Sequence, residues 1–111
     1  MGDINGDDIA LIREMAGADV KGNETNGKLA NLNLSNANLV NGGIYYTGIT
    51  QEVSSSNELW QYMFYKCGSL TSIVLPNNIA HIGAFALSYS GITSFTIPNN
   101  IQTIGNEAFA N

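Results

Sequence analysis

Apolar and polar positions in the C-terminal third of the chain repeat at a fixed offset. Residues 70–91 (LTSIVLPNNIAHIGAFALSYSG) return as residues 92–111 (ITSFTIPNNIQTIGNEAFAN), twenty-two positions later, and nine of the twenty aligned pairs are identical. Within each copy, an apolar pattern predicts a short strand, which a proline ends because proline has no amide to donate to a strand ladder. Each copy therefore predicts one strand, a Pro-Asn-Asn turn, and a return segment that closes in a half-turn of helix.

The same register continues towards the N-terminus. Apolar residues in 28–40 (KLANLNLSNANLV) reproduce the strand spacing of 70–75 at an offset of forty-one residues, and those in 59–69 (LWQYMFYKCGS) reproduce the return segment in 79–87. A repeat of about 20–29 residues with this apolar spacing is typical of leucine-rich-repeat solenoids. We therefore predict an α/β fold, a short right-handed leucine-rich-repeat solenoid with an N-terminal helical cap.

The beginning of the chain follows a different pattern. Residues 7–16 (DDIALIREMA) place apolar residues at helical spacing, with acids that can accept the free amides of the first turn and Gly17 just after the end. We predict a helical cap and loop over 1–28, followed by repeats over 29–111. The segment 42–57 (GGIYYTGITQEVSSSN) is rich in Gly, Ser and Thr and breaks the periodicity, which predicts an inserted loop.

A calcium site is the alternative interpretation of the same N-terminal stretch. Residues between Asp3 and Glu14 loosely follow the ligand spacing of a calcium-binding loop. Such a loop needs glycine at its sixth position for a sharp turn, and Asp8 stands there instead. Helix capping is the favoured interpretation, so we nominate no metal ligand and no cofactor.

Charge is scarce, at 12% of residues, and the net charge is −5. Residues 1–58 hold eight acids against three basic residues, whereas residues 59–111 hold only Lys66 and Glu107. Nucleic acids and anionic membranes are bound by clustered Lys and Arg, and because no such cluster occurs, neither is an expected partner. No run of eighteen apolar residues indicates a membrane span, and the start MGDINGDD lacks the basic and apolar regions of an export signal.

Few side chains are suited to catalysis. Cys67 is the only cysteine, which excludes an intrachain disulfide and favours a buried thiol. His81 is the only histidine and takes the position of Thr103 one repeat later, which favours an outer face over a catalytic base. No nucleophile, base and orienting group can be nominated together, so the chain is not expected to be an enzyme. Trp60 and Tyr62 suggest a carbohydrate-stacking surface, but packing is favoured because they lie in a return segment.

The repeat residues resemble the BspA-type leucine-rich repeat of surface proteins from gut and oral Bacteroidetes, with the pattern L-T-S-I-x-I-P-x-S-V-x-x-I-G-x-x-A-F-x-x-C. Segments 6–17 (GDDIALIREMAG), 32–40 (LNLSNANLV) and 62–73 (YMFYKCGSLTSI) resemble the head that often precedes such repeats. The departures are local: residues 85–87 blur the A-F step, and Ser90 replaces the cysteine. The resemblance implies a secreted or outer-surface, adhesion-type protein that binds host extracellular-matrix or bacterial surface proteins and carries no shared catalytic residues.

The binding surface is expected on the strands. Because side chains alternate along a strand, those between the inward apolar residues face the concave side. The candidates on this face are Asn31, Asn33, Ser72, Val74, Ser94 and Thr96. A second candidate surface is the inserted loop, through Tyr45 and Tyr46.

Three five-residue strands about 4.8 Å apart form a face of only a few hundred Å². A stable protein interface buries about 800 Å² per partner, so this face alone is too small for tight binding. Either the inserted loop widens it, or the repeats belong to a longer array or an oligomer, in which residues 92–111 form an open end that pairs with another copy. The alternative function is structural: a capping or spacer segment of a larger surface protein with no ligand of its own.

Overall fold

The computed structural model describes residues 3–47, 52–53, 58–77, 79–93, 95 and 99–110. Its helix α1 (Gly6–Met15) begins at Asn5, which with Asp8 forms a capping box. The amide of Asp8 donates to the Asn5 side chain (3.2 Å), and the amide of Asn5 donates to the Asp8 carboxylate (3.0 Å). The helix ends at Ala16, and Gly17 follows with a φ of +110°. The predicted helix over 7–16 is thus confirmed, although Asn5 is its N-cap instead of an aspartate.

This helix contradicts the calcium alternative. A calcium loop wraps irregular backbone around the ion and turns sharply at its sixth position. Here the backbone from Gly6 onward is regular helix, and the side chains of Asn5 and Asp8 serve the cap. The stretch from Asp3 to Glu14 therefore does not have the geometry of a calcium-binding loop.

The predicted strands of the first two repeats pair in the register that the sequence indicates. β2 (Asn31–Asn33) lies parallel to β7 (Ser72–Val74), with Asn31 opposite Ser72 and Leu32 opposite Ile73. The offset is forty-one residues, as the apolar spacing predicted. The stacking continues beyond β7, because the amide of Thr93 donates to the carbonyl of Thr71 (3.3 Å).

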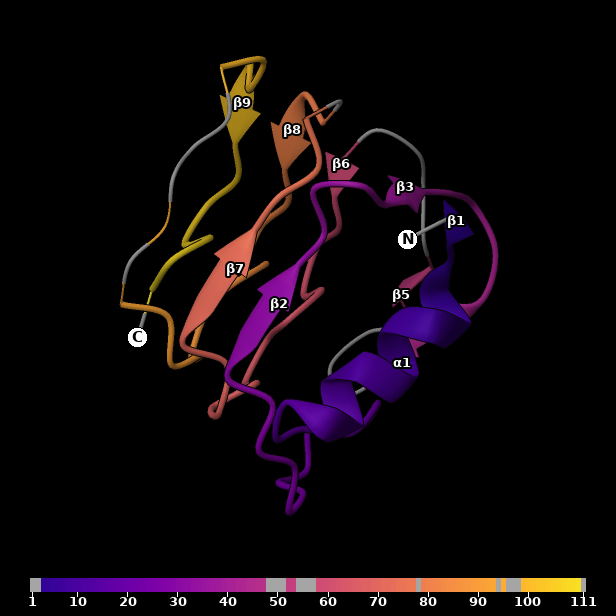
Figure 1. Ribbon diagram of the computed structural model, residues 1–111, viewed down its shortest axis with the longest axis vertical. Helices are drawn as coiled ribbons and strands as arrows, with labels where there is room; N and C mark the ends of the chain where they lie inside the picture. Colours follow the sequence, from indigo (N-terminus) through magenta and orange to yellow (C-terminus); the bar gives the residue numbers. More distant parts are fainter. Residues whose placement is uncertain are drawn as a thin grey trace.

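The return segments form a second parallel sheet, with the strand order β6-β8-β9. Its strands are β6 (Glu58–Leu59), β8 (His81–Ile82) and β9 (Thr103–Ile104). Leu59, Ile82 and Ile104 occupy one row across it, as their matched positions in the sequence predicted. We call the three successive repeats the first coil (29–69), the second coil (70–91) and the third coil (92–111). Figure 1 shows these coils side by side, with α1 at one end and β9 at the other.

Turns that repeat with the coils connect the return segments to the next strands. Tyr62, Phe85 and Glu107 occupy equivalent positions in successive coils, and all three have left-handed backbone, with φ of 59°, 59° and 54°. This conformation lets alternate amides point towards the next coil. The amide of Phe64 donates to the carbonyl of Ala86, and the amide of Leu87 donates to the carbonyl of Ala108 (both 2.8 Å). These segments are turns in the structure, so the expectation of a half-turn of helix is wrong.

The remaining strands close the N-terminal end of the stack. β1 (Asp3–Ile4) is parallel to β3 (Asn38–Leu39), and β4 (Ile44–Tyr46) is antiparallel to β5 (Glu52–Val53). α1 packs against β4. Apolar side chains from the cap and from the first two coils share one buried core, which includes Ile9, Leu34, Leu39, Leu59, Phe64, Leu70 and Ile79.

Candidate functional site

The face formed by β2 and β7 brings together four of the six predicted strand residues. The side chains of Asn31, Asn33 and Val74 are exposed and that of Ser72 is half-buried, whereas Leu32 and Ile73 between them point into the core. We call this surface, made of Asn31, Asn33, Ser72 and Val74, the strand face. Ser94 and Thr96, the two candidates of the third coil, lie outside the described residues.

Hydrogen bonds order the polar side chains of the strand face. The hydroxyl of Ser72 donates to the side-chain oxygen of Asn31 on the neighbouring strand. The side-chain oxygen of Asn33 accepts the amide of Ser35 (2.9 Å), which fixes the turn after β2. Val74 lies opposite Asn33 and is half exposed, so the face combines oriented amides with one accessible apolar side chain. Such a surface is suited to contacts with another protein.

Tyr45 and Tyr46 do not lie on an exposed loop, so this expectation is wrong. Both belong to β4 and are buried, at 1% and 2% exposure. The hydroxyl of Tyr45 donates to the carbonyl of Gln61, and its ring lies 5.1 Å from that of Trp60. The two tyrosines cover the N-terminal end of the first coil, where an uncovered row of apolar residues would otherwise meet water. They are therefore core residues and are not available to a partner.

A column of aromatic rings continues this covering layer through the first two coils. Tyr46 stacks on Tyr62 at 5.1 Å, and Tyr62 stacks on Phe85 at 5.0 Å with nearly parallel rings. Tyr65 meets Tyr62 edge-on at 5.0 Å. Trp60 and Tyr62 are buried, which confirms their assignment to packing over carbohydrate stacking.

Arg13 fastens the cap to the first coil, a role that the sequence interpretation missed. Its side chain is fully buried, and its guanidinium donates to the carbonyls of Tyr62 (3.3 Å), Met63 (3.2 Å) and Asp19 (3.0 Å). It also lies 4.9 Å from the centroid of the Tyr46 ring. Burial lowers the pKa of Arg13 from its usual value. The sequence carried a signal for this position, since Arg13 follows Ile9 by four residues and so lies on the apolar face of the helix.

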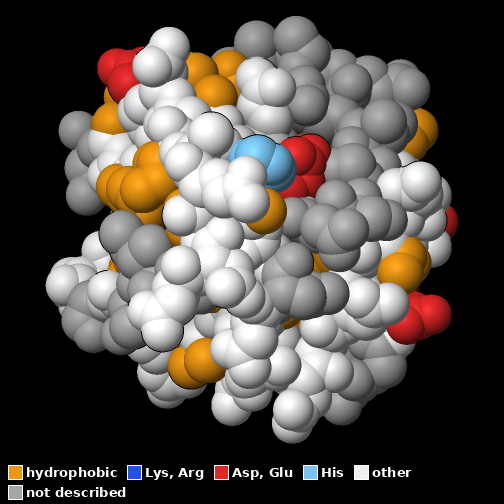
Figure 2. Space-filling view, turned by 90° about the horizontal axis from the view of Figure 1, so that it is seen from above, with side chains coloured by type: hydrophobic (Ala, Val, Ile, Leu, Met, Phe, Trp, Pro, Cys, Tyr) orange, Lys and Arg blue, Asp and Glu red, His pale blue; other side chains and the backbone are white. Residues whose placement is uncertain are grey.

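Cys67 and His81, the two side chains best suited to catalysis, both make structural contacts. Cys67 is buried as predicted, and burial raises the pKa of its thiol to about 11, although the charge of Arg13 acts in the opposite direction. It is therefore a protonated, unreactive thiol at neutral pH. His81 is partly exposed, and its Nδ1 lies 2.6 Å from the hydroxyl of Thr103. Figure 2 shows the histidine beside an acidic side chain, and Glu58 is its register partner in β6.

Within the described ranges, no group of three or more His, Cys, Asp and Glu side chains could hold a metal ion. No helix in the same part of the chain is long and apolar enough to cross a membrane.

The return strands β6, β8 and β9 pair in parallel at offsets of 23 and 22 residues, and β2 and β7 pair in parallel beside them, which is the arrangement of a repeat protein of the leucine-rich type. A family model described as the BspA type leucine-rich repeat region (6 copies) matches residues 47–111. The chain belongs to this family, which confirms the resemblance of its repeat residues. No curated protein and no solved structure matches it. The parallel pairing of β2 with β7 continues the stack to Asn31, upstream of the matched residues.

Proposed function

We propose that this chain is a non-enzymatic, adhesion-type module that binds another protein outside the cell or at its surface. Its fold is a right-handed solenoid with a helical cap over 1–28 and repeats over 29–111. Membership of a leucine-rich-repeat family supports a protein-interaction role, and the observation that carries the proposal is the strand face. There, Val74 is half exposed beside the ordered amides of Asn31 and Asn33. The sequence repeat also nominates Ser94 and Thr96, which lie outside the described residues, as contributors to binding.

The partner is proposed to be an extracellular-matrix protein of a host or a surface protein of another bacterium. The strand face has no charged side chain among its described residues, so recognition there depends on hydrogen bonds from amides and hydroxyls around the apolar Val74. Binding to such a surface depends only weakly on salt, because salt screens charges and leaves these contacts largely unaffected. Its small area predicts weak binding by one module and stronger binding when several copies act together.

The test is binding to an immobilised panel of purified matrix proteins, measured by biolayer interferometry. Val74→Glu places a charge on the strand face, where Val74 is 50% exposed, and Leu11→Glu places the same charge at an exposed apolar residue of α1, which is 61% exposed. We expect Val74→Glu to abolish binding and Leu11→Glu to leave it intact. Equal binding by the two variants would exclude the strand face as the site. Absence of binding to every panel member would favour the alternative, a capping or spacer segment without a ligand.

A second copy of the chain is a further proposed partner, supported by the exposure of the third coil. Ile104 is 46% exposed, while Leu59 and Ile82 in the same row are buried. Phe109 is 38% exposed, whereas Leu87 at the equivalent position of the second coil is buried. In the first and second coils, a neighbouring coil covers this row of apolar residues. In the third coil the same row is exposed.

The backbone at this edge is complementary to itself. In the second coil, the carbonyls of Ala80 and Ile82 accept bonds from the third coil, and the amides of Phe85 and Leu87 donate to it. The equivalent groups of the third coil lie 22 residues later. They are the carbonyls of Gln102 and Ile104 and the amides of Glu107 and Phe109, and they face the exposed edge. Two copies related by a two-fold axis place the carbonyls of each opposite the amides of the other. Light scattering after size-exclusion chromatography should show a dimer that Ile104→Asp dissociates, whereas a strict monomer at every concentration would refute this mode.

A further inference from the structure

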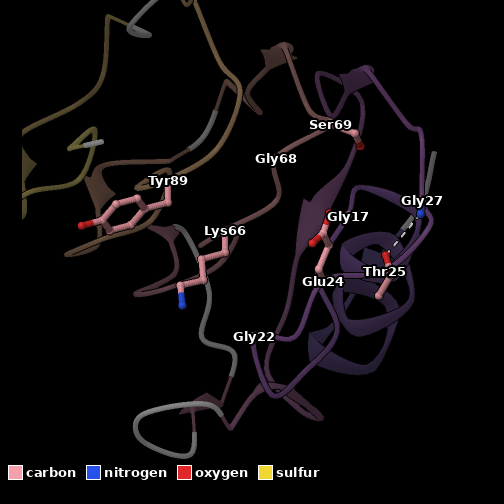
Figure 3. A pocket seen from close by; sticks show the side chains of 9 residues that line it. All are labelled: Gly17, Gly22, Glu24, Thr25, Gly27, Lys66, Gly68, Ser69 and Tyr89. Atoms are coloured by element: carbon pink, nitrogen blue, oxygen red, sulfur yellow. Dashed lines mark hydrogen bonds between the residues drawn. The ribbon is translucent and has the colours of Figure 1, made fainter.

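A polar groove lies between the N-terminal loop and the turns of the first two coils, away from the strand face. Its volume is about 580 Å³. Figure 3 shows Tyr89 and Lys66 on one side of it and Glu24 and Thr25 on the other, with glycines between them. Sites for small ligands and short peptide segments typically have volumes of about 300–1,000 Å³. The groove is therefore large enough for a few residues of a partner chain.

One of the glycines that line the groove is not required by the fold. At Gly27, an added Cβ would stand 2.2 Å from the carbonyl oxygen of Glu14, so packing excludes a side chain there. At Gly68, the nearest heavy atom to an added Cβ is the carbonyl oxygen of Lys66, at 4.0 Å, and the φ of Gly68 lies outside the left-handed region. The fold therefore tolerates a side chain at position 68, and that side chain would take up space in the groove.

The floor of the groove offers hydrogen-bond donors. The amides of Gly17 and Gly68 donate no hydrogen bond to the described part of the chain, and an added Cβ on Gly17 would lie 3.4 Å from the Gly68 nitrogen. Gly17 is buried, and a buried amide without an acceptor costs about 1–3 kcal/mol. Gly68 is exposed, so its amide is accessible, and the two adjoining amides favour a ligand that brings two oxygen acceptors.

A cation and an aromatic ring line the same groove. Lys66 is exposed, has no acidic partner within the described ranges, and its ammonium lies 5.5 Å from the centroid of the Tyr65 ring. Tyr89 is 55% exposed, yet its ring is held edge-on against Tyr65 at 5.7 Å. The groove thus has a positive charge and an apolar platform on the side opposite Glu24.

We propose that this groove binds a carboxylate of a partner peptide. The amides of Gly17 and Gly68 and the ammonium of Lys66 donate to the two carboxylate oxygens, which together accept several hydrogen bonds. An apolar side chain next to the carboxylate packs on the exposed ring of Tyr89, and Glu24 on the opposite side accepts N–H groups of the peptide. A sugar fits less well, because its hydroxyls require several side-chain acceptors, and among the described residues that line the groove Glu24 is the only carboxylate.

The test uses fluorescence anisotropy with three labelled tetrapeptides that carry phenylalanine at the third position. The first ends in alanine with a free carboxylate, the second is its C-terminal amide, and the third is an amide that ends in aspartate. We expect at least one of the two acidic peptides to bind about tenfold or more tightly than the neutral amide, which corresponds to about 1.4 kcal/mol. Binding of the first identifies a chain terminus as the source of the carboxylate, and binding of the third an acidic side chain.

Two variants act on the groove by unrelated means. Lys66→Asn removes the cation and uses a residue that tolerates the left-handed φ of 63°. Gly68→Leu fills the groove. We expect each to weaken binding about tenfold or more, and Lys28→Asn, which removes the same charge outside the groove, to change it less than about twofold. A thermal melt shows whether each variant is folded, and one folded variant of the pair is enough to decide.

Three results would overturn the proposal: equal binding of all three peptides, equal effects of Lys66→Asn and Lys28→Asn, or tight binding of a glucuronic acid oligosaccharide without binding of either acidic peptide. The outcome for the strand face is separate, because Val74 does not line the groove. Loss of matrix binding in Val74→Glu therefore tests the proposed function alone.

Discussion

The close approach of successive coils predicts that Gly83 cannot carry even a methyl group. An added Cβ at Gly83 would lie 2.5 Å from the amide nitrogen of Gln61 in the first coil, whereas ordinary contacts begin near 3.4 Å. The neighbours are backbone atoms, so no side chain can rotate away. The coils would have to separate by nearly 1 Å at the place where the amide of Gly83 donates to the carbonyl of Leu59 (2.7 Å).

The free-energy cost follows from this contact. Overpacking a well-packed site costs about 1–3 kcal/mol, and a lengthened ladder bond adds to it, so Gly83→Ala should destabilise the fold by about 2–3 kcal/mol. Urea unfolding can be followed by the fluorescence of Trp60, which is buried. With a slope of about 1.5 kcal/mol per M, the midpoint should fall by roughly 1.3–2 M.

Two matched variants sharpen this test. Gly105→Ala makes the same 2.5 Å contact one repeat later, with the amide nitrogen of Ala84. The third coil is more exposed and can move outward, so we expect a smaller loss, of about 1 kcal/mol. Gly68→Ala meets no atom closer than 4.0 Å and should change stability by less than about 0.5 kcal/mol. Equal stability of the Gly83→Ala and Gly68→Ala proteins would refute the packing argument.

Three further predictions concern stability. The pKa of the Cys67 thiol is about 11 in the folded chain and 9.0 in the unfolded chain, so the unfolded chain loses the proton first as pH rises. The free energy of unfolding should therefore fall by roughly 2–3 kcal/mol between pH 9 and pH 11. Cys67→Ala should show a smaller fall when urea unfolding is repeated across this pH range. Glu107→Gly should raise the melting temperature, because a non-glycine residue at the left-handed φ of 54° carries about 1 kcal/mol of strain that glycine does not. Glu24→Gly, the control, should not raise it. A lower melting temperature for Glu107→Gly would contradict this prediction. Arg13→Lys should cost about 2 kcal/mol in urea unfolding, because an ammonium cannot reach all three carbonyls of the guanidinium, and an unchanged midpoint would disprove that role.

The register of the coils could be predicted from the sequence because the repeated residues align with one another. The apolar spacing shared by 28–40 and 70–75 placed Asn31 opposite Ser72, and the matched return segments placed Leu59 in a row with Ile82. The strand face followed from the alternation of side chains, which depends only on backbone geometry.

Other features depend on contacts between distant segments. Tyr45 and Tyr46 lie among Gly, Ser and Thr, a composition that indicates a loop, and only the apolar end of the first coil explains their burial. The left-handed backbone at Tyr62 and Phe85 is equally hidden, because neither residue type favours it. The carbonyls of the next coil, which accept the amides of these turns, stabilise that conformation.

The most direct measurement of the proposed function is an NMR titration of the ¹⁵N-labelled chain with a matrix protein fragment from the binding panel. If the strand face is the site, the amide signals of Asn31, Asn33, Ser72 and Val74 should shift together, while those of α1, including Leu11, stay in place. Shifts confined to α1 or to the exposed third coil, with the strand-face signals unchanged, would contradict the proposal that the chain binds its partner through β2 and β7.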